Sequence, residues 1–255
     1  MATSTAAEPE RAAAPRAPLP HPTRRNWVWF SCQVVLQLVF TVWLRYRSSG
    51  AEKIPASGGG LVLVNHQSSL DPFLVGLPLS RPVSYLARDS LFRLPVIGWL
   101  LRNTYVMPIS REAASSASIK GAVERMRQGF LVGIFPEGTR SFDGAVGPFK
   151  PGFIALVRRG KVPVYPVGVA GAHEAMPRDR LLLRPRRVTV VFGDPLTPEE
   201  IARYSARGQE DALVALARER VIACQREAEA WRQRLAAGQR PARPGTPRHD
   251  GDPVV

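Results

Sequence analysis

Cysteine and histidine are scarce in this 255-residue chain, which has 2 Cys and 4 His. Cys32 and Cys224 form no C-x-x-C pair, and no group of histidines accompanies either of them. This scarcity argues against a disulfide framework and against a zinc site. The sequence also lacks internal repeats, a zinc-finger or RNA-recognition pattern and a G-x-S-x-G nucleophile elbow. Repeat architectures and hydrolases with a serine on such an elbow are therefore poor matches.

Acidic residues are few beside basic ones. Asp and Glu number 21 against 35 Lys and Arg, which leaves a net charge of +14. Such an excess points to a polyanionic partner, namely nucleic acid, anionic lipid or a phosphorylated substrate, without choosing among them. Apolar residues make up 45% of the chain, enough for a sizeable core. We expect one domain with tails.

Long apolar runs are limited to one stretch of about 18 residues, Trp27–Leu44, with arginines on both sides. A bilayer core of about 30 Å needs about 20 residues, so the run is barely long enough to span it. Its flanking Trp residues also suit a helix lying in the membrane interface. A buried core helix and a cleaved signal peptide are the alternatives. We expect a membrane-associating helix over 24–47, after a disordered lead over 1–23.

Short β-rich runs alternate with helical patterns from about residue 48 to 236, which predicts an α/β domain with a mixed sheet flanked by helices. A Pro- and Arg-rich tail over 237–255 is expected to be disordered. The expected strands are 61–64, 83–87, 104–108, 131–135, 162–169 and 187–192. The expected helices are 72–78, 94–102, 116–128, 152–159 and 198–233, the last interrupted at Gly208 and capped by Thr197 and Glu200.

The first candidate for chemistry is the segment NHQSSLDPF, residues 65–73. His66 and Asp71 are five residues apart, so a continuous helix would hold their side chains about 140° apart. Asp71 and Pro72 are typical of a helix start, with Asp71 as N-cap, which leaves His66 on the preceding loop. There a carboxylate can bond one imidazole nitrogen and leave the other free to take a proton. The alternative is a histidine and an aspartate that only cap a loop and a helix.

The second candidate is IFPEGTRS, residues 134–141, at the end of an expected strand. Open α/β sheets bind ligands at the carboxyl ends of their strands. Arg140 can grip a phosphate through two hydrogen bonds, Gly138 allows close backbone approach, and Thr139 can bond locally. The alternative is a turn that carries an ion pair between Glu137 and Arg140.

Two further basic residues are Arg111, in the segment PISRE before residues 134–141, and Lys150, in the segment PFKPGF after them. Alone, each is typical of a solvated surface charge. Together with H-x4-D and FPEGTRS in this order, they make the chain resemble the bacterial type of the 1-acyl-sn-glycerol-3-phosphate acyltransferase family over roughly residues 52–195. Two departures from the family pattern stand out. The segment before Arg111 lacks the Gly and Asp that are frequent there in the family, and Pro151 follows Lys150 where many members have a basic or small residue.

The resemblance implies a site and a reaction. His66 is then the catalytic base and Asp71 its orienting acid, and 162–169 lies on the acyl-donor side. The glycerol phosphate is held by Arg111, Glu137, Gly138, Thr139 and Arg140, helped by Lys150. Backbone N–H groups near Gly138 are expected to stabilise the oxyanion. Because neither Ser68 nor Ser69 lies on a nucleophile elbow, the substrate's own hydroxyl is expected to attack.

The expected reaction moves an acyl group from acyl-CoA or acyl carrier protein to the sn-2 hydroxyl of lysophosphatidic acid, giving phosphatidic acid, without a metal or another cofactor. The expected partners are these substrates and anionic membrane lipids, with no nucleic acid, and the expected location is the cytoplasmic membrane with the catalytic domain facing the cytoplasm. Another lyso-lipid or glycerol 3-phosphate as acceptor is an alternative. A non-catalytic basic protein that binds lipid or nucleic acid is a more distant one.

Overall fold

The structure is a computed structural model that describes residues 21, 26–109, 116–180, 182–204, 206, 208–239 and 243–244. The expected lead over 1–23 and most of the expected tail over 237–255 lie outside these residues. So does Arg111.

Seven strands form one mixed sheet in the order β1-β7-β6-β2-β5-β3-β4. Neighbouring strands are parallel, except that β7 runs antiparallel to β6. The strands are β1 Arg47–Ser49, β2 Gly60–Val64, β3 Val83–Arg88, β4 Met107–Ile109, β5 Leu131–Ile134, β6 Val164–Ala170 and β7 Thr189–Phe192. The predicted α/β class and mixed sheet are confirmed, while the short edge strand β1 was not predicted.

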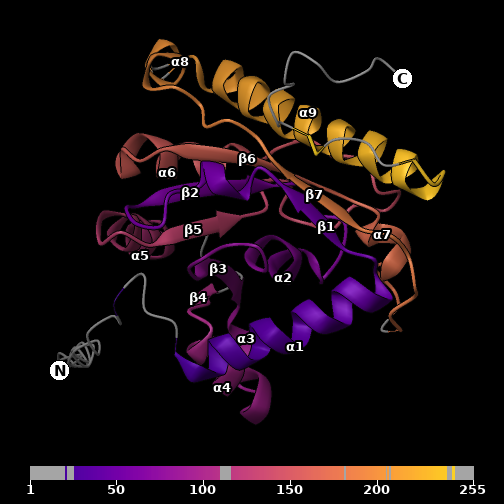
Figure 1. Ribbon diagram of the computed structural model, residues 1–255. Helices are drawn as coiled ribbons and strands as arrows, with labels where there is room; N and C mark the ends of the chain where they lie inside the picture. Colours follow the sequence, from indigo (N-terminus) through magenta and orange to yellow (C-terminus); the bar gives the residue numbers. More distant parts are fainter. Residues whose placement is uncertain are drawn as a thin grey trace, which may run out of the picture.

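Helices cover both faces of the sheet (Figure 1). They are α1 Trp27–Trp43, α2 Asp71–Gly76, α3 Asp89–Phe92, α4 Pro95–Asn103, α5 Ser116–Arg127, α6 Ile154–Gly160, α7 Ala172–Ala175, α8 Pro198–Arg203 and α9 Glu210–Ala236, with 3-10 turns η1 Ala51–Lys53 and η2 Pro151–Phe153. The predicted break at Gly208 separates α8 from α9. The prediction of a strand over 104–108 is wrong at its start, because Tyr105 has a positive φ of 65° and closes a turn before β4.

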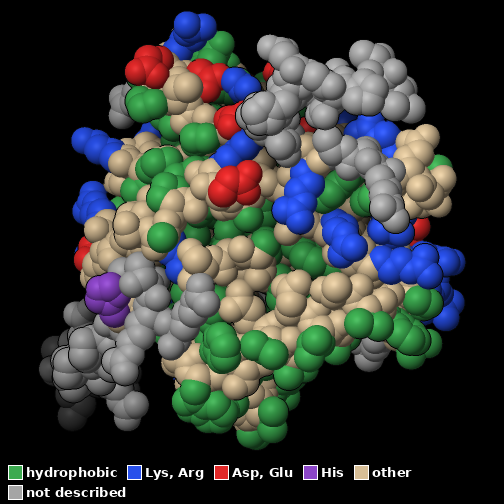
Figure 2. Space-filling view, viewed as in Figure 1, with side chains coloured by type: hydrophobic (Ala, Val, Ile, Leu, Met, Phe, Trp, Pro, Cys, Tyr) green, Lys and Arg blue, Asp and Glu red, His purple; other side chains and the backbone are tan. Residues whose placement is uncertain are grey.

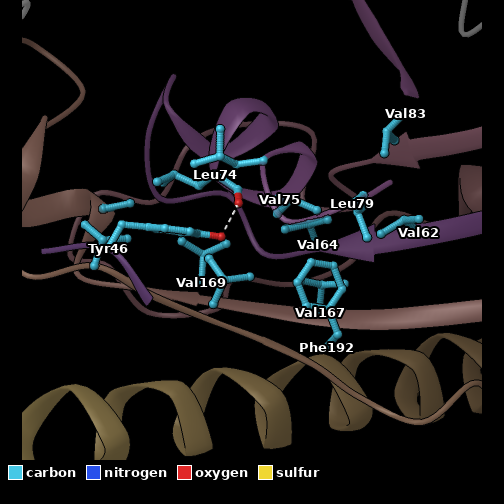
Figure 3. Close-up of a cluster of buried hydrophobic side chains, with 14 of the residues drawn as sticks. Tyr46, Val62, Val64, Leu74, Val75, Leu79, Val83, Val167, Val169 and Phe192 are labelled. Atoms are coloured by element: carbon cyan, nitrogen blue, oxygen red, sulfur yellow. Dashed lines mark hydrogen bonds between the residues drawn. The ribbon is translucent and has the colours of Figure 1, made fainter. Parts of the chain in front are cut away.

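Alternation along the strands divides the core into two layers. Leu61 and Leu63 of β2 pack under α5, α6 and α9, whereas Val62 and Val64 pack under α1 and α2. The side chains of β2 are buried on both faces of the sheet, which explains the continuous apolar run of this strand. Figure 3 shows the second layer, where the Tyr46 hydroxyl donates to the Leu74 carbonyl at 2.7 Å.

The long helix α9 lies against β6 and β7 (Figure 1). At Gly168 a Cβ would lie 2.1 Å from the backbone nitrogen of Gln225, so only glycine permits this approach. Before α9, Thr197 caps α8 in a capping box with Glu200 and Pro198 stands in the first turn, which confirms the prediction for this helix start.

The apolar N-terminal segment folds as α1, capped by the Asn26 side chain, which accepts from the Trp29 N–H at 2.7 Å. Phe40 and Leu44 pack into the core, whereas the opposite side of the helix stays exposed. In the part of the chain that the structure describes, no helix is both long and apolar enough to cross a membrane. This finding gives no support to the expected membrane-associating helix over 24–47.

Candidate active site

Three loops meet at the carboxyl edge of the sheet, after β2, β5 and β6. The His66 carbonyl accepts from the Ser141 N–H at 2.7 Å, which joins the first two loops. The Gln67 side chain donates to the Gly144 carbonyl at 2.6 Å and accepts from the Ala172 N–H at 3.1 Å. These bonds fix the loop that carries His66 between its neighbours on both sides.

His66 and Asp71 meet as predicted. The His66 Nδ1 lies 2.9 Å from Asp71 Oδ2, and the same oxygen accepts the N–H groups of Gln67 at 2.7 Å and Ser68 at 2.8 Å. The predicted role of Asp71 as N-cap is wrong. Asp71 is the first residue of α2, and its carboxylate binds these N–H groups upstream of the helix.

The electrostatics of the pair follow from burial. Asp71 is fully buried, which raises the pKa of its carboxyl, while the hydrogen bonds from His66, Ser68 and Gln67 lower it. With Nδ1 bonded to Asp71, the His66 Nε2 is the ring nitrogen left to take a proton from a substrate.

Aromatic rings stack beside the His66 imidazole. Phe135 stacks on it with ring centroids 4.0 Å apart and planes 20° from parallel, and Tyr85 stacks on Phe135 at 5.7 Å. Tyr85 of β3 pairs with Gly133 of β5, so the glycine leaves room for the tyrosine ring. Sequence reasoning missed both aromatic residues, since nothing in one sequence shows which rings share a face of the sheet.

Glu137 is placed differently from the expectation that it binds substrate. Its side chain is buried, with Oε1 accepting the His66 N–H at 2.8 Å and Oε2 accepting the Gly147 N–H at 2.9 Å. Burial raises the pKa of Glu137, while these two hydrogen bonds lower it. The carboxylate makes this brace and not the ion pair with Arg140 that was the alternative reading, so Glu137 positions the histidine loop.

The remaining residues of the motif surround this brace. Gly138 has a positive φ of 70°, which favours glycine, and its N–H donates to the Phe135 carbonyl at 2.9 Å. That N–H is therefore not free to stabilise an oxyanion, contrary to the expectation. Thr139 and Lys150 are exposed, and a Cβ on Gly138 would lie 3.0 Å from the Lys150 Nζ.

Arg140 has a basic neighbour that sequence reasoning missed. Its Nη1 donates to the Ser69 hydroxyl and to the Arg178 carbonyl, each at 3.0 Å. The Arg178 guanidinium lies over the Phe142 ring at 4.6 Å, and its Nη1 approaches the Arg140 carbonyl at 3.4 Å. Arg140 and Arg178 thus lie next to each other beside the loop that carries His66. Arg178 lies in a segment with no recognisable motif.

Two cavities lie beside this constellation. Cavities of 480 and 520 Å³ run along α9 and share Arg218, Ile222 and Arg226 in their walls. Gln67 contributes to the first of them, but neither His66 nor Asp71 does. Within the described residues, no group of three His, Cys, Asp or Glu is placed to hold a metal ion. The chemistry of the His66 and Asp71 pair, and not cavity volume, identifies the site.

Comparison with known proteins finds acyltransferases that are similar to this chain over the residues of the H-x4-D pair and the E-G-T-R loop. The family model described as Acyltransferase matches residues 45–170, which contain both motifs. Over these residues the chain is similar to that family.

The chain is also similar to proteins named 1-acyl-sn-glycerol-3-phosphate acyltransferase. It is 37% identical over 131 residues to a chloroplast protein of Brassica napus, matching 50% of this chain and 38% of that protein. It is 25% identical over 191 residues to a Bacillus subtilis protein, matching 74% of this chain and 93% of that protein. The chain thus spans well under half of the plant relative and nearly all of the bacterial one.

The fold is also that of a solved structure. The 1-acyl-sn-glycerophosphate acyltransferase PlsC from Thermotoga maritima superposes with a TM-score of 0.65 at 26% sequence identity, over 82% of this chain and 79% of that protein. The expectation of a glycerolphosphate acyltransferase-like α/β domain is confirmed by this match.

Proposed function

We propose that this chain transfers an acyl group from a thioester, acyl-CoA or acyl carrier protein, to the sn-2 hydroxyl of 1-acyl-sn-glycerol 3-phosphate, giving phosphatidic acid. The observation that carries the proposal is the hydrogen bond between His66 Nδ1 and the buried Asp71 carboxylate, 2.9 Å long, beside the loop of Arg140. The names of the relatives support the choice of acceptor.

The hydroxyl of lysophosphatidate is a poor nucleophile until its proton is removed. His66 Nε2 takes this proton as the oxygen attacks the thioester carbon, and Asp71 stabilises the imidazolium that forms. Collapse of the tetrahedral intermediate breaks the carbon–sulfur bond, and the imidazolium returns the proton to the leaving thiolate. No covalent acyl-enzyme is required, and general base catalysis of this kind contributes about 10² to 10⁴ in rate.

The phosphate of the acceptor is held by Arg140 and Arg178, whose backbones and side chains are joined by hydrogen bonds. Guanidinium groups bind phosphate oxygens through pairs of hydrogen bonds, which orients the glycerol as well as holding it. Lys150, exposed beside Gly138, adds a third positive charge.

A comparison of acceptors tests the phosphate role. We expect Arg140→Ala and Arg178→Ala to raise KM for lysophosphatidate at least tenfold and to leave unchanged whatever transfer the wild type makes to monoacylglycerol, which lacks phosphate. Arg180→Ala, which removes an exposed arginine two residues from Arg178, is the matched control. Equal losses with both acceptors would refute the phosphate role and would favour another lyso-lipid as acceptor.

We also propose that the chain works at the cytoplasmic membrane, with its catalytic domain in the cytoplasm. Acyl thioesters are cytosolic and the acceptor is a lipid, so the enzyme must meet both at a membrane surface. In support, α1 leaves Trp27, Leu38, Val42 and other large apolar side chains exposed. Cell fractionation tests this location, and recovery in the soluble fraction at low salt would contradict it.

A further inference from the structure

Five arginines gather where α1 ends and β7 begins: Arg45, Arg47, Arg184, Arg186 and Arg187, called here the arginine cluster. The backbone brings the two segments together. The Arg47 N–H donates to the Val188 carbonyl at 3.1 Å, and the Val188 N–H donates to the Leu44 carbonyl at 3.0 Å. Arg45 and Arg47 therefore lie beside Arg187 on adjoining strand ends.

Like charges lie close together in the arginine cluster. Burial and the charges of Arg45 and Arg47 lower the pKa of Arg187. Four of the five side chains are exposed, and Arg187 is half-buried. Among the described residues, no carboxylate forms an ion pair with any member of the cluster. Within the described residues the fold thus holds like charges together without an ion-pair partner, as expected for a site that binds an external anion.

An apolar surface adjoins the cluster. Val42, Trp43 and Leu182 are 76%, 49% and 78% exposed, and the Trp43 indole N–H donates to the Leu183 carbonyl at 3.1 Å. The surface continues along α1 and onto α4, which contacts it. Its exposed members are Trp27, Phe30, Val34, Val35, Leu38, Val39, Val42 and Trp43 from α1 and Val96, Ile97 and Trp99 from α4. Figure 2 shows hydrophobic side chains along the lower side of the molecule and basic ones at the right, by the end of α1.

We propose that the arginine cluster binds the phosphate headgroups of anionic phospholipids in a bilayer on which the exposed apolar side chains of α1 and α4 rest. An apolar surface alone would suit a neutral bilayer or a protein partner equally well. Arginines at its border, next to an exposed tryptophan, match the charged and aromatic belt of a protein lying in a lipid interface.

The placement of the cluster gives this binding a consequence for the reaction. Thr189 at the start of β7 pairs with Ala170 at the end of β6, so the cluster lies at the same edge of the sheet as His66. Headgroups held there would keep the active-site edge at the membrane surface, where a lipid acceptor resides. This consequence rests on the proposed function, whereas the lipid binding itself does not.

The test is vesicle flotation of the full-length chain with phosphatidylcholine vesicles, with and without phosphatidylglycerol. A basic residue near an anionic surface contributes about 1 kcal/mol, so the triple variant R45Q/R47Q/R187Q should bind anionic vesicles about a hundredfold more weakly than wild type. The matched control K120Q/R127Q/R159Q removes the same charge from exposed positions on α5 and α6 and should lose less than threefold. Val42→Ser should weaken binding to both kinds of vesicle equally.

Several outcomes would overturn the proposal. The first is a wild-type chain that shows no preference for anionic vesicles. The second is a control variant that loses as much vesicle binding as the triple variant. The third is release of the protein from anionic vesicles by duplex DNA at equal charge concentration. If the triple variant fails to fold, the single variant Arg45→Gln, at an exposed position, takes its place. It should bind anionic vesicles severalfold more weakly than wild type. Thiol release with detergent-dispersed substrates is measured in parallel. Lipid binding without any thiol release would refute only the proposed function.

Discussion

Replacing Glu137 by alanine separates the role that the structure assigns to this residue from the role that its motif suggests. The carboxylate accepts the N–H groups of His66 and Gly147 at 2.8 and 2.9 Å. Each N–H that loses a buried partner costs about 1–3 kcal/mol, and removal of a buried carboxylate returns part of that cost. We therefore expect Glu137→Ala to lower the free energy of unfolding by about 2–4 kcal/mol.

The same substitution should slow catalysis. Without the brace the His66 backbone shifts, and a displacement of about 1 Å can cost about 10² in rate. We expect kcat to fall about a hundredfold while KM for lysophosphatidate changes less than threefold, because both oxygens of the Glu137 carboxylate are bonded to backbone N–H groups. Glu137→Gln retains one acceptor oxygen, so its kcat and its free energy of unfolding should lie between those of wild type and Glu137→Ala. Glu227→Ala removes an exposed carboxylate on α9 and should change neither kcat nor the free energy of unfolding.

Urea unfolding followed by circular dichroism, with steady-state thiol release on the same preparations, measures both effects. A Glu137→Ala variant that keeps wild-type stability and kcat but raises KM tenfold would refute the brace. It would restore the ligand role that the sequence suggested for this residue.

Three further predictions concern stability and reactivity. Gly133→Ala places a Cβ 2.3 Å from the Tyr85 ring, so we expect a loss of at least 1–3 kcal/mol in urea unfolding, and an unchanged midpoint would contradict the packing described here. Thr197→Ala removes the capping box with Glu200 and should cost about 1 kcal/mol in the same assay, an effect that a wild-type midpoint would rule out. Burial raises the pKa of Cys224 to about 12, so native protein should show no rapid reaction of this thiol with Ellman's reagent, and labelling before unfolding would disprove its burial.

Much of the fold could be predicted from the sequence because its signals are local. The apolar run of β2, the cap at Thr197 and the break at Gly208 each depend on a few neighbouring residues. The edge strand β1 could not be predicted, since Arg47–Ser49 carry no apolar alternation and are held in the sheet by pairing with β7.

The site divides in the same way. The spacing of His66 and Asp71 around a helix start indicated that they meet, and they do, at 2.9 Å. The Asp71 carboxylate accepts N–H groups of its own loop, from Gln67 and Ser68. The direction of the Glu137 carboxylate was not predictable, because the His66 N–H that it accepts belongs to another loop, which the sheet brings next to it. Arg178 escaped notice for the same reason, since its nearness to Arg140 is a tertiary contact.

The central claim is that His66 acts as the base in acyl transfer to the sn-2 hydroxyl of 1-acyl-sn-glycerol 3-phosphate. Its most direct test is thiol release by detergent-purified protein given oleoyl-CoA, with and without 1-acyl-glycerol 3-phosphate, beside His66→Ala, with the lipid products identified by mass spectrometry. We predict acceptor-dependent thiol release with formation of phosphatidate, and its loss in a variant that folds normally. Activity of His66→Ala within tenfold of wild type would contradict the claim. So would a wild-type protein that releases no thiol with oleoyl-CoA or acyl carrier protein donors and any of a panel of lyso-lipids.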